Sequence, residues 1–440
     1  MLTKTFSPGF KRFLLIIALF FGISGLRPVI NSCSHPSVYD KDFISPYLMA
    51  KAMLAGVNPY LPLSELAARW LPDLPHDIFP HPTPHTPTLG LLCLPLALFE
   101  YQTAARIWLA IELGCLLASA FLLLRWWGTP LTARRMILVC GFALGWPPIT
   151  SDLMFGQLNL PLLAILFAAL LALRDGKDVA GGAMLGALFA LKLMGWPVVI
   201  FLALRRRWRG VVAAGAVAVA ANLLAMAVIG SGSVRDYYLK VGPQVAAHYH
   251  SNDLNFSAWT VGARLFSDFG FNYLTRTPWP SATLDHLLTY AAPLVILLGA
   301  IVLALKVARF DAAFALLAGA SIILSPVAWP YYLVLALIPI AVAIRSLQEL
   351  EWPRNQTLLA LGLCLLISLR QMPYVAIASA FADRTAQAGI PVIPFAVGLL
   401  SLLPAVEILG LLWLVWRVGR MKSDSDLSFG SAQKVMLRVE

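Results

Sequence analysis

Residues 13–30 read FLLIIALFFGISGLRPVI, an apolar run long enough to cross a bilayer, and Lys11-Arg12 precede it. The run lacks a small-residue cleavage site, so we predict an uncleaved signal anchor. Because basic residues favour the cytoplasmic side of a membrane, this span should run outward. The polar stretch Tyr39-Asp40-Lys41-Asp42-Phe43 follows closely. The sequence therefore predicts two carboxylates at an external boundary between lipid and water.

The composition is that of a protein that crosses a membrane several times. Of its 440 residues, 59% are hydrophobic and 12% are charged, much less charge than a soluble protein of this length exposes. Backbone groups in lipid must hydrogen-bond internally, and the alternating segments of a barrel are missing, so we predict helical spans. The formal net charge is +11, which in a soluble protein would suggest nucleic acid. Here the basic residues cluster in short loops between apolar runs, which indicates membrane topology and no nucleic-acid partner.

No metal centre is predicted. The five cysteines are scattered, and no pair has the spacing of metal ligands or of a disulfide framework. His81 and His85 are four residues apart, but the intervening prolines exclude a helix that would bring the two rings together. The segment Asp40-Lys41-Asp42 has the spacing of a metal-binding acidic pair, which we interpret as chance. No cofactor is therefore predicted firmly, and a requirement for a divalent metal stays open.

The apolar runs predict an all-α fold, a polytopic membrane helical bundle of about 11 to 13 spans with both ends of the chain in the cytoplasm. Residues 1–422 are expected to form a single integral membrane domain. Residues 423–440 are polar and are predicted to form a disordered cytoplasmic tail. Two long external loops, residues 31–86 and 231–285, are expected to carry short helices on the membrane surface.

Three shorter stretches decide the details of this topology. The segment from Ser45-Pro46 to Gly56 has helix start and stop signals and apolar residues at helical spacing, which predict a helix lying on the bilayer. Residues 86–99 are apolar but short for a span, so the span count over residues 86–127 is open. Residues 178–204 lie between two basic clusters and cannot form two full spans, which predicts a hairpin of two short helices with Lys192 near its tip.

The polar residues gather on the side of the membrane that we predict to be external. All seven histidines fall on or near that side, as do the turns at residues 152–159 and 325–332. A transporter would distribute polar residues through the middle of the membrane and would show internal repeats, and we find no convincing repeat. Any chemistry is therefore expected at the outer surface.

Several short motifs follow one another in the order and spacing of a known family. Over roughly residues 10–345 the chain resembles glycosyltransferase family 87, membrane enzymes of the GT-C class that depend on polyprenyl-phosphate sugars. Each motif alone is weak, and the ordered set is typical of the family but of no particular substrate. The motifs are Asp42-Phe43 with Tyr47 and Ala50, Gly56-Val57-Asn58-Pro59-Tyr60, Leu94-Pro95-Leu96-Ala97, Gly156-Gln157-Leu158-Asn159, Leu191-Lys192-Leu193 with Trp196-Pro197, Arg205-Arg206-Arg207-Trp208, Asn255-Phe256-Ser257 with Arg264, and Leu324-Ser325-Pro326 with Trp329 and Tyr332.

The resemblance implies an inverting sugar transfer on the periplasmic face, with an aspartate of the first external loop as the base. By its register before Phe43 and Tyr47, this residue is Asp42, and Asp40 is the runner-up. The chemistry is consistent with this, because an inverting transfer needs one carboxylate that accepts the proton of the acceptor hydroxyl. Asp42 could instead cap the surface helix, and Asp40 could be a solvated loop charge.

The resemblance also suggests groups that would bind the donor. Lys192 is a cation inside the membrane, a costly position that is usually functional, and its partner would be the donor phosphate. It could instead reach an interface with its long side chain. Arg264 is the second phosphate candidate. Gln157 and Asn159 could bind sugar hydroxyls or could cap and join helices. The residues that we expect around the sugar and acceptor are Tyr47, Tyr60, His85, Gln157, Asn159, Asn255, Trp329 and Tyr331.

One motif departs from the family. Relatives often carry Ser-Trp-Asp-His-Tyr late in the sequence, whereas this chain has Ala328-Trp329-Pro330-Tyr331-Tyr332. If the histidine of the relatives assists catalysis or phosphate binding, then Tyr331 must replace it or the activity must differ.

We therefore predict a multi-pass glycosyltransferase of the bacterial plasma membrane. It would transfer a hexose, plausibly mannose, from polyprenyl phosphate to a lipid-linked or cell-envelope acceptor on the external side of the lipid bilayer. Pentoses such as arabinofuranose also occur in the family, so the sugar is open. The alternatives are a transporter of lipid-linked glycans and a relative that has lost its activity.

Overall fold

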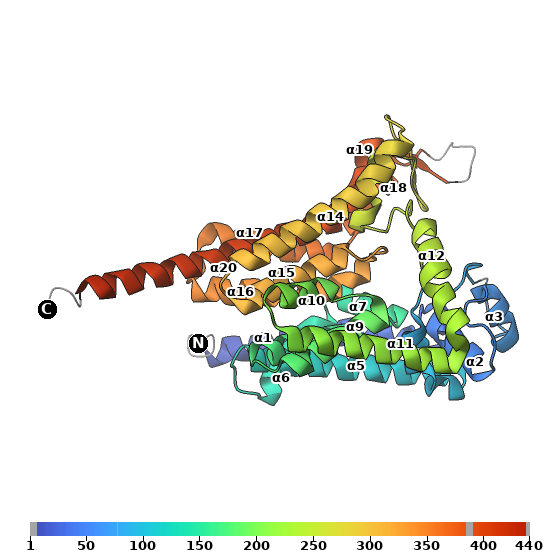
Figure 1. Cartoon of the computed structure of the whole chain (residues 1–440), viewed down its shortest axis with the longest axis horizontal. Helices are drawn as coiled ribbons and strands as arrows, with labels where there is room; N and C mark the ends of the chain where they lie inside the picture. Colours follow the sequence, from blue (N-terminus) through green and yellow to red (C-terminus); the bar gives the residue numbers. More distant parts are fainter. Residues whose placement is uncertain (1–6, 77, 384–389, 437–440) are drawn as a thin grey trace. The chain divides into compact units, whose positions relative to one another are not determined.

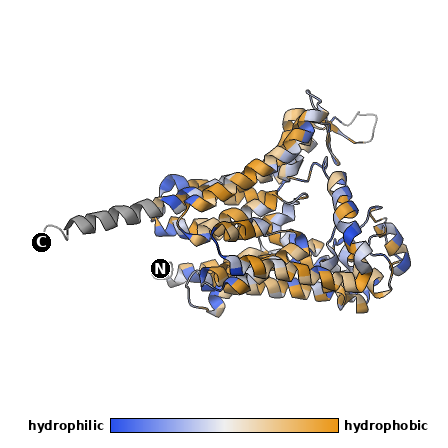
Figure 2. Ribbon diagram, viewed as in Figure 1, coloured by the Kyte–Doolittle hydropathy of each residue, from blue (hydrophilic) through white to orange (hydrophobic). Residues whose placement is uncertain are grey.

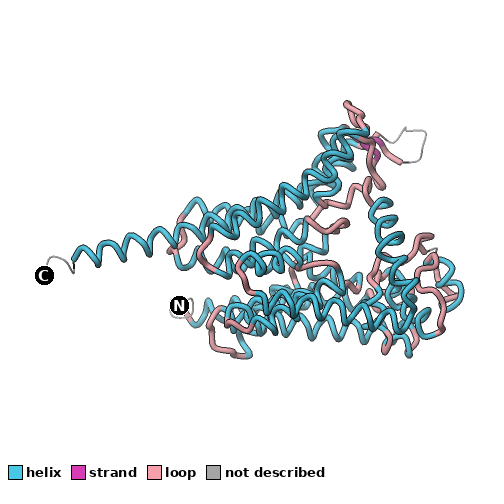
Figure 3. The backbone as a smooth tube through the Cα atoms, in the orientation of Figure 1, coloured by secondary structure: helices cyan, strands magenta, loops and turns pink. Residues whose placement is uncertain are grey.

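The computed structural model describes residues 7–76, 78–383 and 390–436. Figure 3 shows that the described chain is built almost wholly of helices. Among the described residues, the only strands are β1 (Leu274–Thr275) and β2 (Val392–Ile393), which pair in parallel. The prediction of an all-α membrane protein is therefore confirmed.

Six helical segments of the described chain are long and apolar enough to cross a membrane. Two bent helix pairs pass the same test together: α6 (Ala133–Leu144) with α7 (Pro147–Phe155), and α17 (Arg354–Leu369) with α18 (Met372–Phe381). Figure 2 shows that the long helices are hydrophobic over most of their length. The six segments are Gly9–Asn31, Tyr101–Trp126, Trp208–His248, Ala282–Lys306, Pro330–Glu349 and Phe395–Met421.

This count is lower than the predicted 11 to 13 spans. Two expected spans are short helices instead, α8 (Asn159–Arg174) and α15 (Phe310–Ile323). The helix α9 (Asp178–Lys192) is short, as predicted. Nearly every residue of α15 is buried in the protein. A short apolar helix can satisfy its backbone without spanning the bilayer when protein surrounds it, which hydropathy alone does not reveal.

The contacts divide the chain into two compact units, whose helices carry their labels in Figure 1. The first unit holds the described residues up to Ala172, with Asp178–Leu193 and Val212–His248. The second holds Leu173–Lys177, Met194–Val211 and the chain from Tyr249 onward.

The first unit is built around closely packed helices. The helix α1 (Pro8–Asn31) packs along α6, and α5 (Tyr101–Trp126) packs against α6 as well. Glycines permit the close approach of α1 and α6: a Cβ added at Gly22 would lie 3.1 Å from the Cα of Gly141. Small residues at such an interface let two backbones come together, which is a common way for helices to pack in membranes.

The segment after α1 forms a compact layer of short helices, and one prediction about it is wrong. The helix α2 (Ile44–Leu54) is buried on nearly all sides and does not lie on a surface, because its neighbours cover it. It begins at Ile44, slightly before the predicted start at Ser45-Pro46, and Gly56 follows its end with a φ of +64°. The neighbouring elements are α3 (Leu63–Trp70), α4 (Pro87–Cys93) and the 3₁₀ turns η1 (Ser37–Asp40) and η2 (Leu96–Leu98).

Residues 178–204 form two short helices, as predicted. The first, α9, ends at Lys192, and the second, α10 (Trp196–Leu204), begins after Gly195. Leu193 and Gly195 have φ angles of +50° and +81°, so the helical backbone is interrupted between them.

The second predicted loop is shorter than expected. The helix α11 (Trp208–Asp236) bends at Gly230, where φ is +81°, and continues through the π-turn η3 (Tyr237–Val241) into α12 (Gly242–His248). Helix therefore occupies residues 231–248, and the irregular part of the predicted loop 231–285 begins at Tyr249.

The second unit packs its long helices around α15. Its neighbours are α10, α14 (Ala282–Lys306), α16 (Leu337–Glu349) and α20 (Leu403–Met436). The backbone of α20 continues as helix beyond Ser423, where the sequence predicted a tail, because extending a helix costs far less than starting one. The shorter elements of this unit are η4 (Ala258–Thr260), α13 (Val261–Phe266), η5 (Pro330–Ala336), α19 (Phe395–Gly398) and η6 (Leu399–Leu402).

Candidate active site

The end of α7 fixes the backbone on both sides of Asp42. The buried ammonium of Lys41 donates hydrogen bonds to the carbonyls of Leu153 (3.2 Å) and Met154 (2.7 Å) in the last turn of α7. On the other side, the backbone N–H of Phe43 donates to the carbonyl of Phe155 at 3.3 Å. A cation at the C-terminus of a helix satisfies carbonyls that have no partner in the helix and interacts favourably with its dipole. Asp42 is thus held at a defined place although it lies between helices.

Burial has a clear effect on Lys41. Loss of water around the ammonium lowers the pKa of Lys41, and Cys33 and Glu112 oppose this shift by electrostatic attraction. Its third hydrogen bond goes to the hydroxyl of Ser32 at 2.8 Å. In the sequence, Lys41 stands out only as the residue between Asp40 and Asp42. In the structure, its side chain anchors the Asp42 segment.

The carboxylate of Asp42 is partly exposed and accepts a hydrogen bond from the side-chain amide of Gln157. Gln157 follows Gly156, whose φ of +64° ends α7 and turns the chain. The indole N–H of Trp108 donates to the carbonyl of Gly156 at 3.0 Å, and its ring stacks on Phe43. The motif Gly156-Gln157 therefore meets the Asp42 motif directly, as an arrangement of both around one site requires.

Asp40 lies in a different environment from Asp42. Its side chain is 61% exposed, and its carboxylate lies 2.9 Å from the ring nitrogen Nε2 of His76. An exposed contact of this kind contributes little to stability.

A second set of polar side chains, those of Asp152, Asn159 and Lys192, is joined by hydrogen bonds, and Asn159 lies close to Gln157 in the sequence of the turn. The ammonium of Lys192, at the end of α9, donates to the side-chain oxygen of Asn159 at 3.1 Å. The amide nitrogen of Asn159 donates to the carboxylate of Asp152 at 2.6 Å. Lys192 also interacts electrostatically with Asp152 and Asp42. Asn159 thus links a cation and an anion, which combines the helix-joining and site-lining roles that the sequence left open.

His85 lies beside Lys192, because the residues after it are bonded to the end of α9. The hydroxyl of Thr86 donates to the carbonyl of Leu191 at 2.9 Å, and that of Thr88 donates to the carbonyl of Ala190. Burial, together with repulsion from the Lys192 ammonium, lowers the pKa of His85 to about 3. Its imidazole is therefore neutral at physiological pH.

The two predicted tyrosines of the first unit hold the surroundings of the site. Tyr60 stacks on Tyr237, and its hydroxyl donates to the carbonyl of His85 at 3.3 Å. Burial raises the pKa of Tyr60 far above its usual value. Tyr47 donates from its hydroxyl to the carbonyl of Phe99 at 2.9 Å and packs in the aromatic cluster around Phe43. Both hydroxyls are engaged with backbone carbonyls, so these two residues support the backbone around the site.

The first unit therefore brings together five of the predicted residues from four separate segments: Asp42, His85, Gln157, Asn159 and Lys192. Sequence reasoning missed Asp152 and Lys41 as parts of this group. A signal for Asp152 was present, because an ionisable residue near the end of an apolar helix is expected to have a specific partner.

The four remaining predicted residues lie in the second unit, where Asn255 joins two loops. Its amide nitrogen donates to the carbonyl of Tyr249 at 3.0 Å, and its side-chain oxygen accepts the N–H groups of Ser257 (3.1 Å) and Ala328 (2.9 Å). The hydroxyl of Ser257 in turn donates to the carbonyl of Ser325 at 2.5 Å. The two late sequence motifs are thus bonded to each other by amide and hydroxyl side chains.

Arg264 is completely buried, and its guanidinium donates to backbone carbonyls. The acceptors are Ser251 (3.3 Å), Asn252 and Asn255 (3.0 Å). The guanidinium also lies over the ring of Phe269, 4.4 Å from its centroid. Burial lowers the pKa of Arg264 to about 10, so it stays protonated at neutral pH. Its contacts are those of a residue that organises the loop before α13.

Trp329 and Tyr331 lie in the late motif and are partly buried. The indole of Trp329 meets Tyr249 edge to face at 5.1 Å, and the ring of Tyr331 packs against Tyr332 at 5.6 Å. Tyr331 therefore packs against its neighbour in the late motif.

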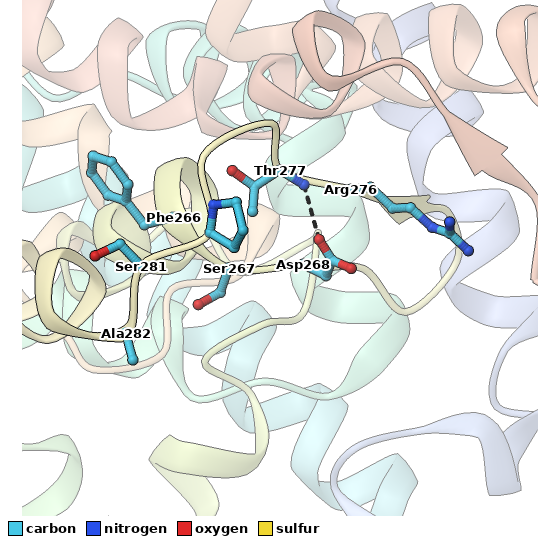
Figure 4. Close-up of a pocket in the computed structure, with 8 residues that line it drawn as sticks. Phe266, Ser267, Asp268, Arg276, Thr277, Ser281 and Ala282 are labelled. Atoms are coloured by element: carbon cyan, nitrogen blue, oxygen red, sulfur yellow. Dashed lines mark hydrogen bonds between the residues drawn. The ribbon is translucent and has the colours of Figure 1, made fainter.

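The second unit also has a pocket of about 520 Å³ at the start of α14, shown in Figure 4. Its polar groups are largely engaged within the protein: Asp268 accepts the N–H of Thr277 at 2.9 Å, and Ser267 donates to Asp285 at 2.5 Å. The pocket contains none of the predicted site residues. It is lined by Phe266, Ser267, Asp268, Arg276, Thr277, Pro280, Ser281 and Ala282.

The comparison with known proteins identifies the class of enzyme. Residues 84–330, more than half of the chain, match glycosyltransferase family 87, and the chain belongs to this family. The matched region includes Gln157, Asn159 and Lys192; it begins after Asp42 and ends at Pro330, within the late motif. Family membership and the long apolar helices agree with the membrane protein of this family that the sequence predicted.

A curated relative is the alpha-(1->3)-arabinofuranosyltransferase of Mycobacterium tuberculosis, found in strains CDC 1551 and H37Rv. The two sequences are 29% identical over 165 residues. This match covers 36% of the present chain and 38% of the length of the relative. No solved structure matches significantly.

Proposed function

We propose that this enzyme transfers a sugar from a polyprenyl-phosphate donor to a lipid-linked or cell-envelope acceptor, with inversion, and that Asp42 is the base. The observation that supports this most strongly is the surroundings of Asp42. Its backbone is anchored on both sides by Lys41 and Phe43, and its partly exposed carboxylate is oriented by Gln157. A carboxylate held in this way has little reorganisation left before it accepts a proton.

In the proposed step, the acceptor hydroxyl oxygen forms a bond to the anomeric carbon of the donor sugar. The bond from this carbon to the phosphate oxygen breaks, and the phosphate leaves with the electron pair as polyprenyl phosphate. Asp42 accepts the hydroxyl proton and later releases it to water. Attack opposite to the departing phosphate inverts the configuration of the anomeric carbon.

Lys192 is proposed to face the donor phosphate. Its ammonium lies at the end of α9, within electrostatic range of Asp42, and Asn159 orients it. Negative charge grows on the leaving phosphate as its bond to the sugar breaks, and a desolvated cation stabilises that charge more strongly than one in water. His85 next to it is neutral and can donate a hydrogen bond without adding charge.

The proposed donor sugar is a hexose such as mannose. A second candidate is arabinofuranose, which the similarity to the mycobacterial arabinofuranosyltransferase favours. The proposed site faces the external side of the plasma membrane, where a lipid-borne donor and an envelope acceptor can meet.

The test is release of labelled sugar by membranes that contain the full chain or its Asp42→Asn variant. Polyprenyl-phosphate mannose and polyprenyl-phosphate arabinofuranose are supplied separately, each with and without EDTA. We expect the wild type to consume one donor and the variant to be slower by about 10³-fold. The EDTA arm shows whether a divalent metal is required.

An equally active Asp42→Asn variant would contradict the assignment of the base, and Asp40→Asn would then be tested. If folded wild-type protein consumes neither donor, the choice of sugar is wrong, and donors with other sugars on polyprenyl phosphate should be assayed.

A further inference from the structure

Asp152 has no assigned role, yet it has the most constrained carboxylate of the site region. It is completely buried in α7. One carboxylate oxygen accepts the amide of Asn159 at 2.6 Å, and the other accepts the backbone N–H of Leu160 at 3.2 Å. These two bonds fix the first turn of α8, from which the side chain of Asn159 projects.

The backbone of Asp152 orients the second site amide as well. Its carbonyl accepts the N–H of Gln157 at 3.0 Å, across the turn at Gly156. Gln157 then donates to Asp42, and Asn159 accepts from Lys192. A single residue therefore positions both amides that contact the charged groups of the site.

From this geometry we infer that Asp152 is a positioning residue of the transfer reaction, which sets the Lys192 ammonium toward the donor phosphate by way of Asn159. The inference rests on the proposed function, in which Lys192 faces that phosphate.

A purely structural role would not need a carboxylate. A buried acid is costly unless its charge is balanced, and a neutral side chain such as asparagine or serine can accept hydrogen bonds at the same kind of turn. In its ionised form the carboxylate places a negative charge one amide away from Lys192, and the two interact electrostatically. That charge favours the charged form of Lys192 and holds Asn159 with its oxygen toward the ammonium.

The neighbouring carboxyl group of Glu112 provides a matched control. Glu112, on α5, is also completely buried and lies within electrostatic range of Asp152. Its carboxyl oxygens have no hydrogen-bond partner among the described residues, so it is not part of the link to Lys192. Glu112→Gln removes a buried carboxyl group from the same region and leaves Asn159 in place.

The experiment measures binding of polyprenyl phosphate, the proposed product, to the full chain in detergent, without turnover. Five proteins are compared: the wild type, Asp152→Asn, Lys192→Gln, the corresponding double variant, and Glu112→Gln. Thermal unfolding of each protein checks that it is folded. We expect Asp152→Asn to weaken binding about tenfold, and to have little further effect once Lys192 is replaced. Glu112→Gln should bind like the wild type.

If Asp152→Asn binds like the wild type, or weakens binding equally with and without Lys192, then Asp152 does not act through Lys192 and the inference is overturned. If Asp152→Asn does not fold, Asn159→Ala interrupts the same link in the middle and should show the same loss of binding and the same dependence on Lys192. Unchanged binding by folded Asn159→Ala would overturn the inference too. Failure of the wild type to bind polyprenyl phosphate contradicts the proposed function itself, which distinguishes the two cases.

Discussion

The region around Asp42 in the first unit and the region around Asn255 in the second use similar side chains in opposite ways. In the first, charged groups bond to amide side chains: Asp42 to Gln157, and Lys192 to Asn159. In the second, the amide of Asn255 and the guanidinium of Arg264 bond to the backbone. Side chains bonded to other side chains hold charges ready for a ligand, whereas side chains bonded to the backbone hold a loop in shape. We therefore expect the hydrogen-bond partner of a side chain, more than its residue type, to distinguish residues of the candidate site from framework residues, which hold a loop in shape.

Replacing Arg264 should have the largest effect of the changes predicted here. It tests whether the region around Asn255 holds a loop in shape. In Arg264→Met three backbone carbonyls each lose a hydrogen bond inside the protein, and we expect the free energy of unfolding to fall by about 3 kcal/mol. Thermal and chemical unfolding in detergent measure this loss, and the donor KM of the folded fraction should not change. Arg276→Met, at an exposed arginine of the same unit, is the control and should stay within about 0.5 kcal/mol of the wild type.

A folded Arg264→Met protein of normal stability with a much weaker affinity for the donor would reverse this assignment. Arg264 would then be the phosphate ligand that its sequence motif suggests.

Replacing Lys192 should act mainly on turnover. Lys192→Met removes the cation that we propose for the phosphate, and we expect kcat/KM of the folded protein to fall about 100-fold, together with a lower unfolding temperature because Asp152 loses the charge that balances its own. Lys192→Arg keeps the charge with another shape and should recover part of the loss. Equal activity of Lys192→Met and the wild type would place the donor phosphate elsewhere.

Gln157 allows a finer test of the candidate site around Asp42. Gln157→Ala removes the hydrogen bond that orients Asp42, and we expect kcat to fall about tenfold with a nearly unchanged KM. Steady-state kinetics with a saturating donor separates the two constants. The same truncation at Asn255 should instead lower stability, and a kcat effect there without loss of stability would remove the distinction between the two regions.

His85 gives the smallest expected effect. Its pKa is lowered to about 3 in the fold, so between about pH 6.5 and pH 3 the unfolded chain binds a proton that the folded protein does not. Stability should therefore fall as the pH drops through this window, by at most about 1.4 kcal/mol per pH unit from this group. His85→Gln should reduce the slope in unfolding experiments at pH 7.5, 6 and 5. His35→Gln, at an exposed histidine, controls for the loss of a ring, and equal slopes in both variants would exclude His85 as the source.

The sequence alone predicted four features of the protein: its membrane class, its helical fold, the two short helices at residues 178–204, and its family. Each depends on local patterns: apolar run length, clustered basic residues, Gly and Pro as helix breakers, and short motifs in order. Helices long and apolar enough to span are fewer than the predicted spans, because several apolar runs form short helices, and hydropathy does not reveal that a helix such as α15 is surrounded by protein.

What the tertiary structure decided is which polar residues meet. Asp40 and Asp42 are two residues apart in the sequence, but only Asp42 lies against the end of α7. Lys41 gained its role from the carbonyl of Leu153, 112 residues further along the chain, and Asp42 from the amide of Gln157, 115 residues further. The physical reason is that a buried polar group must find its partner wherever the fold brings one, and the sequence near that group does not specify which segment this will be.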